Sequence, residues 1–142
     1  MLFRSRYFYA ALSPRSFYIL SNPNMTTAFS NLDPRETEVL TFDASNDLAN
    51  GETLTTIEKV EVTVQSGAPT GTLPELTGQI INGSPVTLTV NGKTITIATG
   101  CCVQVVGSGG VTGTQYLIAI TCSTTNPDKV LTLKGILPVS AQ

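Results

Sequence analysis

The sequence predicts an all-β protein: a single sandwich of about seven or eight strands that follows an extended N-terminal arm. Three observations lead to this prediction. Apolar and polar residues alternate with a period of two in several short runs. Turn-forming residues separate these runs, and one separation is the pair Asn-Gly. No window of useful length has the 3.6-residue period of an amphipathic helix.

The first strands of the body are predicted in residues 37–43 and 53–64. In "TEVLTFD" (37–43), Leu40 and Phe42 share one face of the strand, and Val39 and Thr41 share the other. In "TLTTIEKVEVTV" (53–64), three valines alternate with charged or polar residues. This pattern is typical of a strand with one buried face and one wet face. The segment "ANG" (49–51) supplies the turn between the two strands.

The clearest local pattern is "VTLTVNGKTITIA" (86–98), in which two alternating runs flank Asn91-Gly92. This pair favours a two-residue type I′ hairpin turn, because both central positions need a positive φ. The preceding segment "SGAPTGTLPELTG" (66–78) is rich in glycine and proline, and we interpret it as a loop.

The last strands are predicted in residues 101–106, 114–125 and 129–139. Glycines in 107–113 interrupt the chain after the first of them, and Asn-Pro-Asp at 126–128 joins the other two into a pair. Strands this short and this regularly spaced favour a sandwich with immunoglobulin-like or related topology. The chain has no internal repeat.

Residues 1–30 are predicted to form the arm, and residues 31–142 the sandwich domain. Six of the nine aromatic residues lie within the first 20 positions. The charge divides in a similar way. Residues 1–24 hold three arginines and no acidic residue, whereas the remainder holds five basic and ten acidic residues, a net charge of −5. An acidic body argues against nucleic acid as a partner.

The arm is expected to be ordered by packing on other chains. Fixing about two dozen residues costs backbone entropy that only nearly complete burial of all six rings would offset. A single small domain offers little surface for that burial. The expected partner contacts are the rings and arginines of the arm: Phe3, Arg4, Arg6, Tyr7, Phe8, Tyr9, Arg15, Phe17 and Tyr18.

The N-terminal segment is interpreted as part of the mature protein rather than as a targeting peptide. Ser13-Pro14-Arg15 interrupts its apolar run, and no A-x-A-like cleavage site follows. The segment is also too short and too charged to span a membrane. Met25, in "NPNMTTAF", is an alternative start of translation.

The residue types that catalysis and metal binding need are sparse. The chain has no histidine, which is the commonest general base and metal ligand. Its three cysteines, Cys101, Cys102 and Cys122, do not suit a disulfide framework, because sequence neighbours rarely bridge each other and an odd count leaves a free thiol. We expect them to be reduced and buried as small hydrophobic residues. The prediction is therefore no enzyme, no metal and no cofactor.

Three further patterns point away from a catalytic or ligand site. Glu36 and Glu38 share a strand face, but glycoside hydrolysis also needs a cleft with stacking aromatic rings, and the body has few of these. "DASND" (43–47) resembles part of a calcium loop but lacks the later bidentate glutamate. Residues 107–113 lack the Lys-Ser/Thr ending of a phosphate-binding loop.

Several residues of the body are expected to have structural roles. Gly51 and Gly113 suit turn positions with unusual backbone angles. Asp43 and Asp47 flank a turn, where short carboxylates accept hydrogen bonds from backbone N–H groups. Tyr116 is expected to bury its ring and to tie its hydroxyl to nearby backbone, like the tyrosine corner of such sandwiches.

Four segments resemble a known group of proteins: "LDPRE" (32–36), "LTFDASNDLANGETL" (40–54), "GGVTGTQYLIAITC" (109–122) and "LKGILPV" (133–139). Together they resemble small virion proteins of tailed bacteriophages, which combine a D-P-x-E start, an F-D…L-x-x-G-E-T-[LI] stretch and a late G-G-x-x-G-x-x-Y strand. The resemblance covers under half of the chain and rests on turn glycines and strand positions. It implies an immunoglobulin-like β-sandwich that serves as a capsid decoration or accessory protein.

The function that the resemblance implies is that of a bacteriophage structural protein, a capsid decoration (cement) protein on the outer capsid surface. Such a protein stabilises the head by binding the major capsid protein across subunit boundaries. We expect a homo-oligomer, a dimer or a trimer, with no nucleic acid and no membrane as a partner. Two alternatives stay open: a head–tail connector or tail accessory or adhesion protein of the virion, and a carbohydrate-binding surface module.

Overall fold

The structure, a computed structural model, describes residues 17–67 and 71–141. Within these ranges the chain forms β-strands and one short 3₁₀ helix (Ser45–Asp47), and no α-helix. The strands are β1 (Tyr18–Leu20), β2 (Thr27–Ala28), β3 (Thr37–Asp43), β4 (Leu54–Ser66), β5 (Glu75–Ile81), β6 (Val86–Val90), β7 (Lys93–Ile97), β8 (Cys102–Ser108), β9 (Thr114–Thr124) and β10 (Val130–Val139). The predicted all-β class is confirmed.

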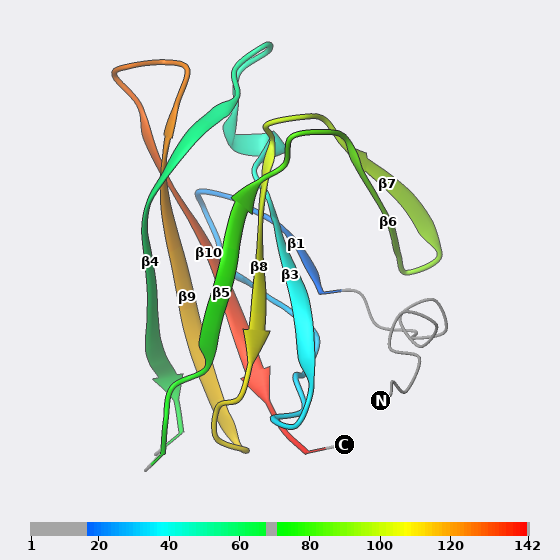
Figure 1. The fold of residues 1–142 in the computed structure, drawn as a ribbon, viewed down its shortest axis with the longest axis vertical. Helices are drawn as coiled ribbons and strands as arrows, with labels where there is room; N and C mark the ends of the chain where they lie inside the picture. The colour runs from blue at the N-terminus through cyan, green and yellow to red at the C-terminus, as the bar shows by residue number, and fades with distance from the viewer. Residues whose placement is uncertain (1–16, 68–70, 142) are drawn as a thin grey trace.

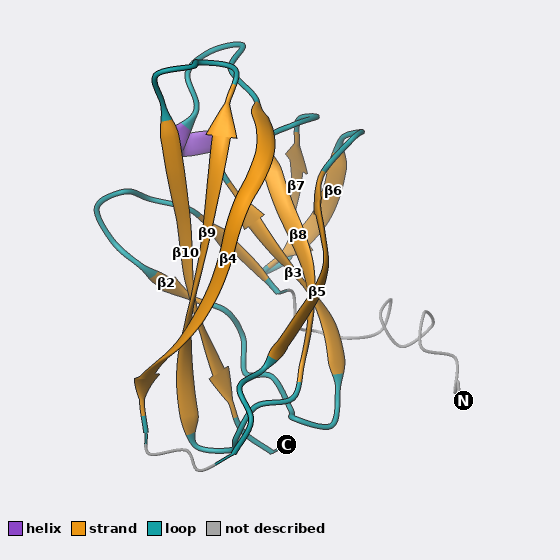
Figure 2. Ribbon diagram, turned by 60° about the vertical axis from the view of Figure 1, so that its left-hand side comes forward, coloured by secondary structure: helices purple, strands orange, loops and turns teal. Residues whose placement is uncertain are grey.

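Two four-stranded sheets make up the body (Figure 1). The first sheet has the order β1-β3-β8-β5, and the second has the order β2-β10-β9-β4. The chain crosses between the sheets after each of the first four strands and again after β8. Figure 2 shows the two sheets as neighbouring layers, with the two-stranded β6–β7 hairpin beside the first sheet. The described strands exceed the expected number because β1, β2 and β5 lie in segments that were interpreted as arm or loop.

The core lies between the two sheets. Alternate residues of β3 and β8 point inward from the first sheet, and alternate residues of β9 and β10 point inward from the second. The buried apolar side chains of these four strands in the core are Leu40, Phe42, Val103, Val105, Tyr116, Ile118, Ile120, Cys122, Leu133, Leu137 and Val139. The predicted shared face of Leu40 and Phe42 is therefore the core face.

Residues 17–30 belong to the sandwich, so the domain boundary differs from the predicted position after residue 30. β1 extends the first sheet parallel to β3, and β2 extends the second sheet parallel to β10. Phe17, Ile19 and Phe29 are buried in the core. The physical reason is the spacing of Phe17 and Ile19, which places both side chains on the inner face of an extended chain. A count of aromatic rings does not reveal this spacing.

Gly135 leaves room for the N-terminal strands. It lies in β10 opposite Thr27 of β2. A Cβ atom at this position would lie 2.7 Å from Ile19 Cδ1 and 2.7 Å from Phe29 Cε2. The Phe29 ring also meets the Phe42 ring edge to face, with centroids 5.0 Å apart. The missing side chain therefore allows the N-terminal segment to close over the core.

The predicted hairpin is confirmed. β6 and β7 pair antiparallel along their whole length. The turn residues Asn91 and Gly92 have φ angles of 51° and 77°, as a type I′ turn requires.

β5 occupies the end of the segment that was predicted to be a loop (66–78). Its register with β8 shifts between Thr77 and Ile80, and Gly78 within the shift has a φ of 62°. A bulge of this kind breaks the alternation of apolar and polar residues by which a strand is recognised. The loop prediction was therefore wrong for the residues of β5.

The expected structural roles of Tyr116 and two glycines are confirmed. The Tyr116 ring is fully buried, and its hydroxyl accepts a hydrogen bond from the Val111 N–H at 2.9 Å. Gly51 and Gly113 have φ angles of 82° and 87°. Asp43 accepts a hydrogen bond at 2.9 Å from the backbone N–H two residues later, as short carboxylates do in turns.

Candidate interaction surface

The solvent side of the first sheet exposes apolar side chains. The strand register aligns Val39 of β3 beside Val106 of β8, and it aligns Thr41 of β3 beside Gln104 of β8. On β5, Ile80 lies beside Gln104. Val39 is 49% exposed and Ile80 is 57% exposed. We call this set of residues, of which Thr41 is buried, the outer face: Tyr18, Val39, Thr41, Ile80, Gln104 and Val106.

The first sheet carries acidic side chains and no basic ones. Its four strands contain no lysine or arginine. Their carboxylates belong to Glu38, Asp43 and Glu75, which give the strands a formal charge of −3. Glu75 is exposed and lies beside Ser108 at one end of the sheet. Glu38 lies on the core side of β3 with Leu40, and Asp43 is buried, so Glu75 is the exposed carboxylate on the side of the outer face.

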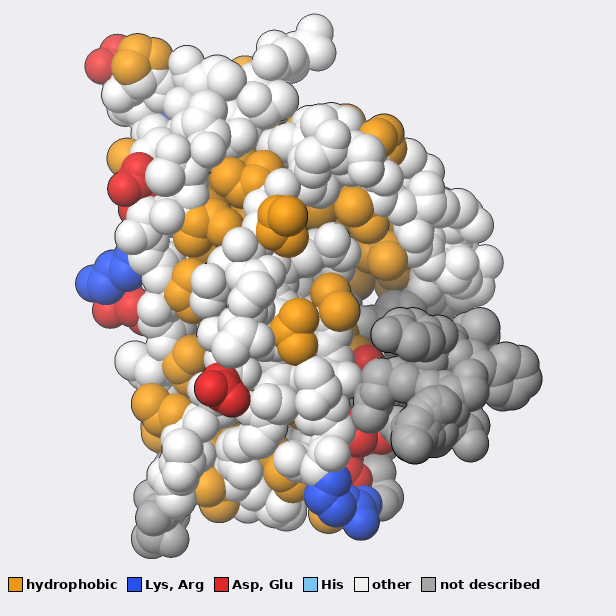
Figure 3. All heavy atoms as spheres, viewed as in Figure 1, with side chains coloured by type: hydrophobic (Ala, Val, Ile, Leu, Met, Phe, Trp, Pro, Cys, Tyr) orange, Lys and Arg blue, Asp and Glu red, His pale blue; other side chains and the backbone are white. Residues whose placement is uncertain are grey.

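The β6–β7 hairpin extends the apolar surface. Figure 3 shows hydrophobic side chains gathered over the first sheet and along the side of the hairpin that faces it. On one face of the hairpin the pairs Val86–Ile97 and Leu88–Ile95 are apolar, and Val90 pairs with Lys93 beside the turn; on the other face the paired residues are threonines. Leu88 and Ile95 of the apolar face are half-buried, and Ile97 is fully buried.

Two residues of the first sheet are held by hydrogen bonds. The Tyr18 hydroxyl donates to Asp43 Oδ2 at 2.7 Å. Burial of the phenol raises the pKa of Tyr18, and the hydrogen bond to Asp43 raises it further. The other oxygen of Asp43 accepts hydrogen bonds from the backbone N–H and the hydroxyl of Ser45. These contacts fix the edge of the first sheet.

The edges of the two sheets are poorly suited to pairing with another strand. β1 has three residues and β2 has two, and short edge strands of this kind limit pairing with another chain. The register of β4 with β9 shifts at three points, and that of β5 with β8 shifts at one. On β4, Lys59 and Glu61 form an exposed ion pair at 3.1 Å. A sheet face is therefore a more suitable surface for contact with other proteins than a sheet edge.

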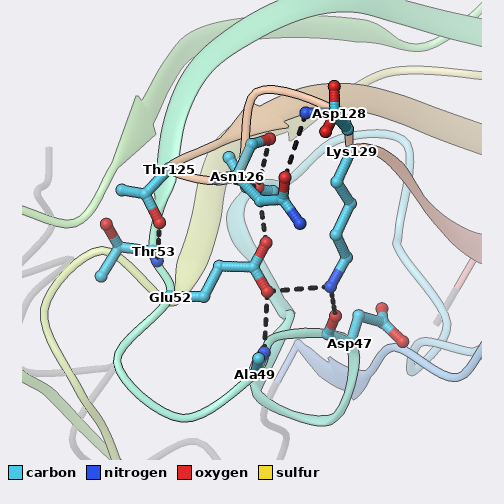
Figure 4. A network of polar contacts seen from close by, with 9 residues as sticks. Asp47, Ala49, Glu52, Thr53, Thr125, Asn126, Asp128 and Lys129 are labelled. Atoms are coloured by element: carbon cyan, nitrogen blue, oxygen red, sulfur yellow. Dashed lines mark hydrogen bonds and ion pairs between the residues drawn. The ribbon is translucent and has the colours of Figure 1, made fainter.

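A buried polar network ties together the loops at one end of the sandwich (Figure 4). One carboxylate oxygen of Glu52 accepts hydrogen bonds from the Ala49 N–H at 2.7 Å and from Lys129 Nζ at 2.8 Å. The other accepts from the Thr124 hydroxyl at 2.6 Å. Lys129 Nζ also donates to the Asp47 carbonyl oxygen at 2.6 Å.

The network stabilises the ionised form of Glu52. The Ala49 N–H, the Lys129 ammonium and the Thr124 hydroxyl lower the pKa of Glu52 to about 2. The carboxylate thereby links the segment around Ala49 to Thr124 of β9 and to Lys129. Asp47 differs from the expected turn role, since its Oδ1 atom is buried without a hydrogen-bond partner.

The three cysteines are free thiols. Cys102 and Cys122 are buried, as expected, whereas Cys101 is partly exposed. Burial raises the pKa of Cys102 to about 12 and that of Cys122 to about 11, with nearby carboxylates adding to both shifts. Burial also raises the pKa of Cys101. A raised pKa opposes formation of the thiolate that a nucleophile or a metal ligand requires.

Within residues 17–67 and 71–141, no group of three or more Cys, Asp or Glu side chains is placed to hold a metal ion. The sequence "DASND" forms the turn after β3 and the 3₁₀ helix, and its first carboxylate is occupied by Tyr18 and Ser45. In the same ranges, no helix is long and apolar enough to cross a membrane.

A polar cavity of about 290 Å³ lies on the second sheet. It is lined by residues 22–26 together with Thr132 and Lys134 of β10. Lys134 is the one charged side chain in this lining. None of the predicted partner contacts lines the cavity.

Comparison with known proteins does not assign a function to these surfaces. No known family, curated protein or solved structure matches the chain. A function has to be inferred from the chain's own residues.

The structure places two of the nine predicted partner contacts, and both lie in the sandwich. Phe17 is 7% exposed in the core of its own chain, so in this fold its ring is not a contact for a partner. Tyr18 lies on the outer face and bonds to Asp43. The other seven lie outside the described residues: Phe3, Arg4, Arg6, Tyr7, Phe8, Tyr9 and Arg15.

Sequence reasoning did not identify the outer face as a candidate surface. The outward position of Val39 could have been predicted from the sequence, because alternation in β3 places Val39 on the face opposite the core residues Leu40 and Phe42. Ile80 had no comparable signal, since it follows the bulge in β5.

Proposed function

We propose that this chain is a structural protein of a bacteriophage virion, a decoration protein on the outer capsid surface. The observation that carries the proposal is the exposed apolar outer face on a sheet without basic residues. Such a surface fits contact with another protein better than contact with nucleic acid. The resemblance of four sequence segments to small virion proteins supports the virion as the location.

The proposal includes an immunoglobulin-like topology. In that fold, seven strands form two sheets with the orders A-B-E-D and C-F-G. The orders β1-β3-β8-β5 and β4-β9-β10 correspond to it when β1 is taken as strand A and β10 as strand G. Tyr116 near the start of β9, which then corresponds to strand F, supports this correspondence, because its hydroxyl bonds to backbone five residues earlier. β2 and the β6–β7 hairpin are then additions to the fold.

The proposed partners are the major capsid protein and further copies of the chain, in a symmetric dimer or trimer. We define the leader as residues 1–16. Its aromatic rings would anchor in pockets of the shell, and Arg4, Arg6 and Arg15 would pair with carboxylates of the partner. Area buried across a capsomer boundary then raises the cost of separating capsomers, which is the mechanism of a cement protein.

Of the two other candidate functions, only the carbohydrate-binding module finds less support. A neck or tail position differs from decoration in copy number rather than in any feature of the described residues. A carbohydrate-binding module would need exposed aromatic rings for stacking. None of the aromatic residues between positions 17 and 141 is exposed.

The test combines a copy count with a binding assay. Quantitative mass spectrometry of purified virions whose genome encodes this chain should find it in hundreds of copies per particle. A neck or tail protein should be present in about six to a few dozen copies, as rings of cyclic symmetry allow. Absence from the particle contradicts the virion proposal.

The binding assay uses a chain that lacks residues 2–16, because residues 17–24 belong to the sandwich. The truncated chain should lose binding to purified capsids that lack the native protein. Val130→Lys, an exposed change on β10 of the second sheet, serves as the control and should bind normally. Normal binding by the truncated chain contradicts the shell contact of the leader.

A further inference from the structure

The leader joins the sandwich at the edge of the sheet that carries the outer face. Residue 16 precedes Phe17, whose carbonyl oxygen accepts a hydrogen bond from the Thr41 N–H of β3 at 2.8 Å. β1 follows at once as the edge strand beside β3. Sixteen extended residues reach about 50 Å, whereas four adjacent strands span about 15 Å. The leader is therefore long enough to cross the outer face of its own chain.

The composition of the leader complements this surface. The leader contains three arginines, no acidic residue and four aromatic rings. The first sheet contains three carboxylates and no basic residue. Its outer face exposes Val39 and Ile80, and the hairpin beside it adds the half-buried Leu88 and Ile95. The rings of the leader therefore suit an apolar surface, and its arginines suit a sheet whose strands carry a negative formal charge.

We propose that in the isolated subunit the leader docks on the outer face of its own chain, beside the β6–β7 hairpin. The rings cover Val39 and Ile80, and an arginine lies near the exposed carboxylate of Glu75. A tether of this length holds the leader at an effective concentration in the millimolar range. Its own face is therefore favoured over that of a second copy in dilute solution. The inference concerns the free chain and stands whether or not the chain is a virion protein.

The first test is binding of a fluorescent synthetic peptide of residues 1–16 to the chain that lacks residues 2–16. Fluorescence anisotropy should show saturable binding. Val39→Lys and Ile80→Lys should each weaken it about tenfold or more, because each removes apolar surface and places a cation opposite the arginines. Val130→Lys is the matched control, since Val130 is 64% exposed on the second sheet, and it should leave the affinity unchanged.

All three changes are at exposed positions, so each variant should fold, and thermal unfolding verifies this. Absence of peptide binding overturns the proposal. Equal weakening by Val39→Lys and Val130→Lys also overturns it, because the peptide would then be held elsewhere or by charge alone.

The second test asks whether the leader occupies its own chain. The full-length chain should bind the peptide about tenfold more weakly than the truncated chain, if the peptide dissociation constant is about 0.1 mM and the effective concentration about 1 mM. Equal affinity for both chains overturns the proposal. Concentration-dependent dimers of the full-length chain that Val39→Lys disrupts would make a second copy the occupant, and would overturn it as well. Capsid binding enters neither test, so failure here is distinct from failure of the virion proposal.

Discussion

One methyl group added at Gly135 tests the packing of the N-terminal strands. Gly135 lacks the left-handed φ that would itself strain an alanine. A new Cβ atom would nevertheless lie 2.7 Å from Ile19 Cδ1 and from Phe29 Cε2, whereas ordinary contacts begin at 3.4 Å. Both buried side chains would therefore have to move, and they come from the segment that the sequence indicated as an arm.

The expected cost of Gly135→Ala follows from two opposing terms. Overpacking a well-filled core costs about 1–3 kcal/mol. Restricting the unfolded chain by replacing glycine returns about 0.5–1 kcal/mol. The net loss should be about 1–2 kcal/mol in the free energy of unfolding. At about 3–4 °C per kcal/mol for a chain of this size, Tm should fall by about 3–8 °C. Urea and thermal denaturation followed by circular dichroism measure both quantities.

Two variants make the test specific. Gly83→Ala is the matched control, because a Cβ atom there meets nothing within 4 Å and the φ of Gly83 is not left-handed, so no loss is expected. Ile19→Val removes Cδ1, one of the two colliding atoms. In its background Gly135→Ala should cost at least about 0.5 kcal/mol less, as coupling between contacting residues predicts. Equal stability of Gly135→Ala and Gly83→Ala would refute the packing of Ile19 and Phe29 against β10.

Three further predictions concern stability. Tyr116→Phe should cost about 1 kcal/mol in urea denaturation, because the Val111 N–H loses its acceptor; unchanged stability would count against the corner. The pKa of Glu52 lies near 2 instead of 4.5, so its stabilising effect should be complete above pH 4.5 and disappear as the pH falls toward 2. Glu52→Gln should be less stable at neutral pH and lose less stability across that interval, and an acid profile equal to that of the native chain would contradict this. Deleting residues 2–16 should lower Tm by only a few degrees, because a leader docked at about ten times its dissociation constant contributes about 1.4 kcal/mol. Deleting 2–24 should lower Tm much further, because two buried core side chains are also lost; equal Tm values for the two deletions would contradict the packing of Phe17 and Ile19 in the core.

Local alternation accounts for much of the fold that the sequence predicted. β3, the β6–β7 hairpin and the β9–β10 pair each combine a two-residue period with a turn signal, and each lies close to its predicted range. Period and turn chemistry act between near neighbours, so they can be read without knowledge of the tertiary structure. Sheet order, in contrast, depends on contacts between distant segments.

The features that the sequence did not predict also depend on contacts between distant segments. β1 is stabilised by pairing with β3 and by the space above Gly135, far away in sequence. β5 is concealed by its bulge at Thr77–Ile80. To predict the outer face, one would need both the existence of β5 and the order of the strands in the sheet. The face places Val39 of β3 and Ile80 of β5 on either side of β8. A candidate surface assembled from three strands is therefore harder to predict than any one of the strands.

Phe17 belongs to the sandwich, whereas the aromatic residues before it belong to the leader. This difference connects the proposed binding of the leader to a shell with its proposed docking on the outer face. Phe17 and Ile19 alternate, so one face of β1 buries both. Tyr7, Phe8 and Tyr9 are consecutive, and in an extended chain consecutive side chains point to opposite faces. A leader laid across the outer face thus buries one set of rings and presents the other to solvent. The rings left outward are then available to a partner, so docking on its own chain and binding to a shell are compatible roles for the same sixteen residues.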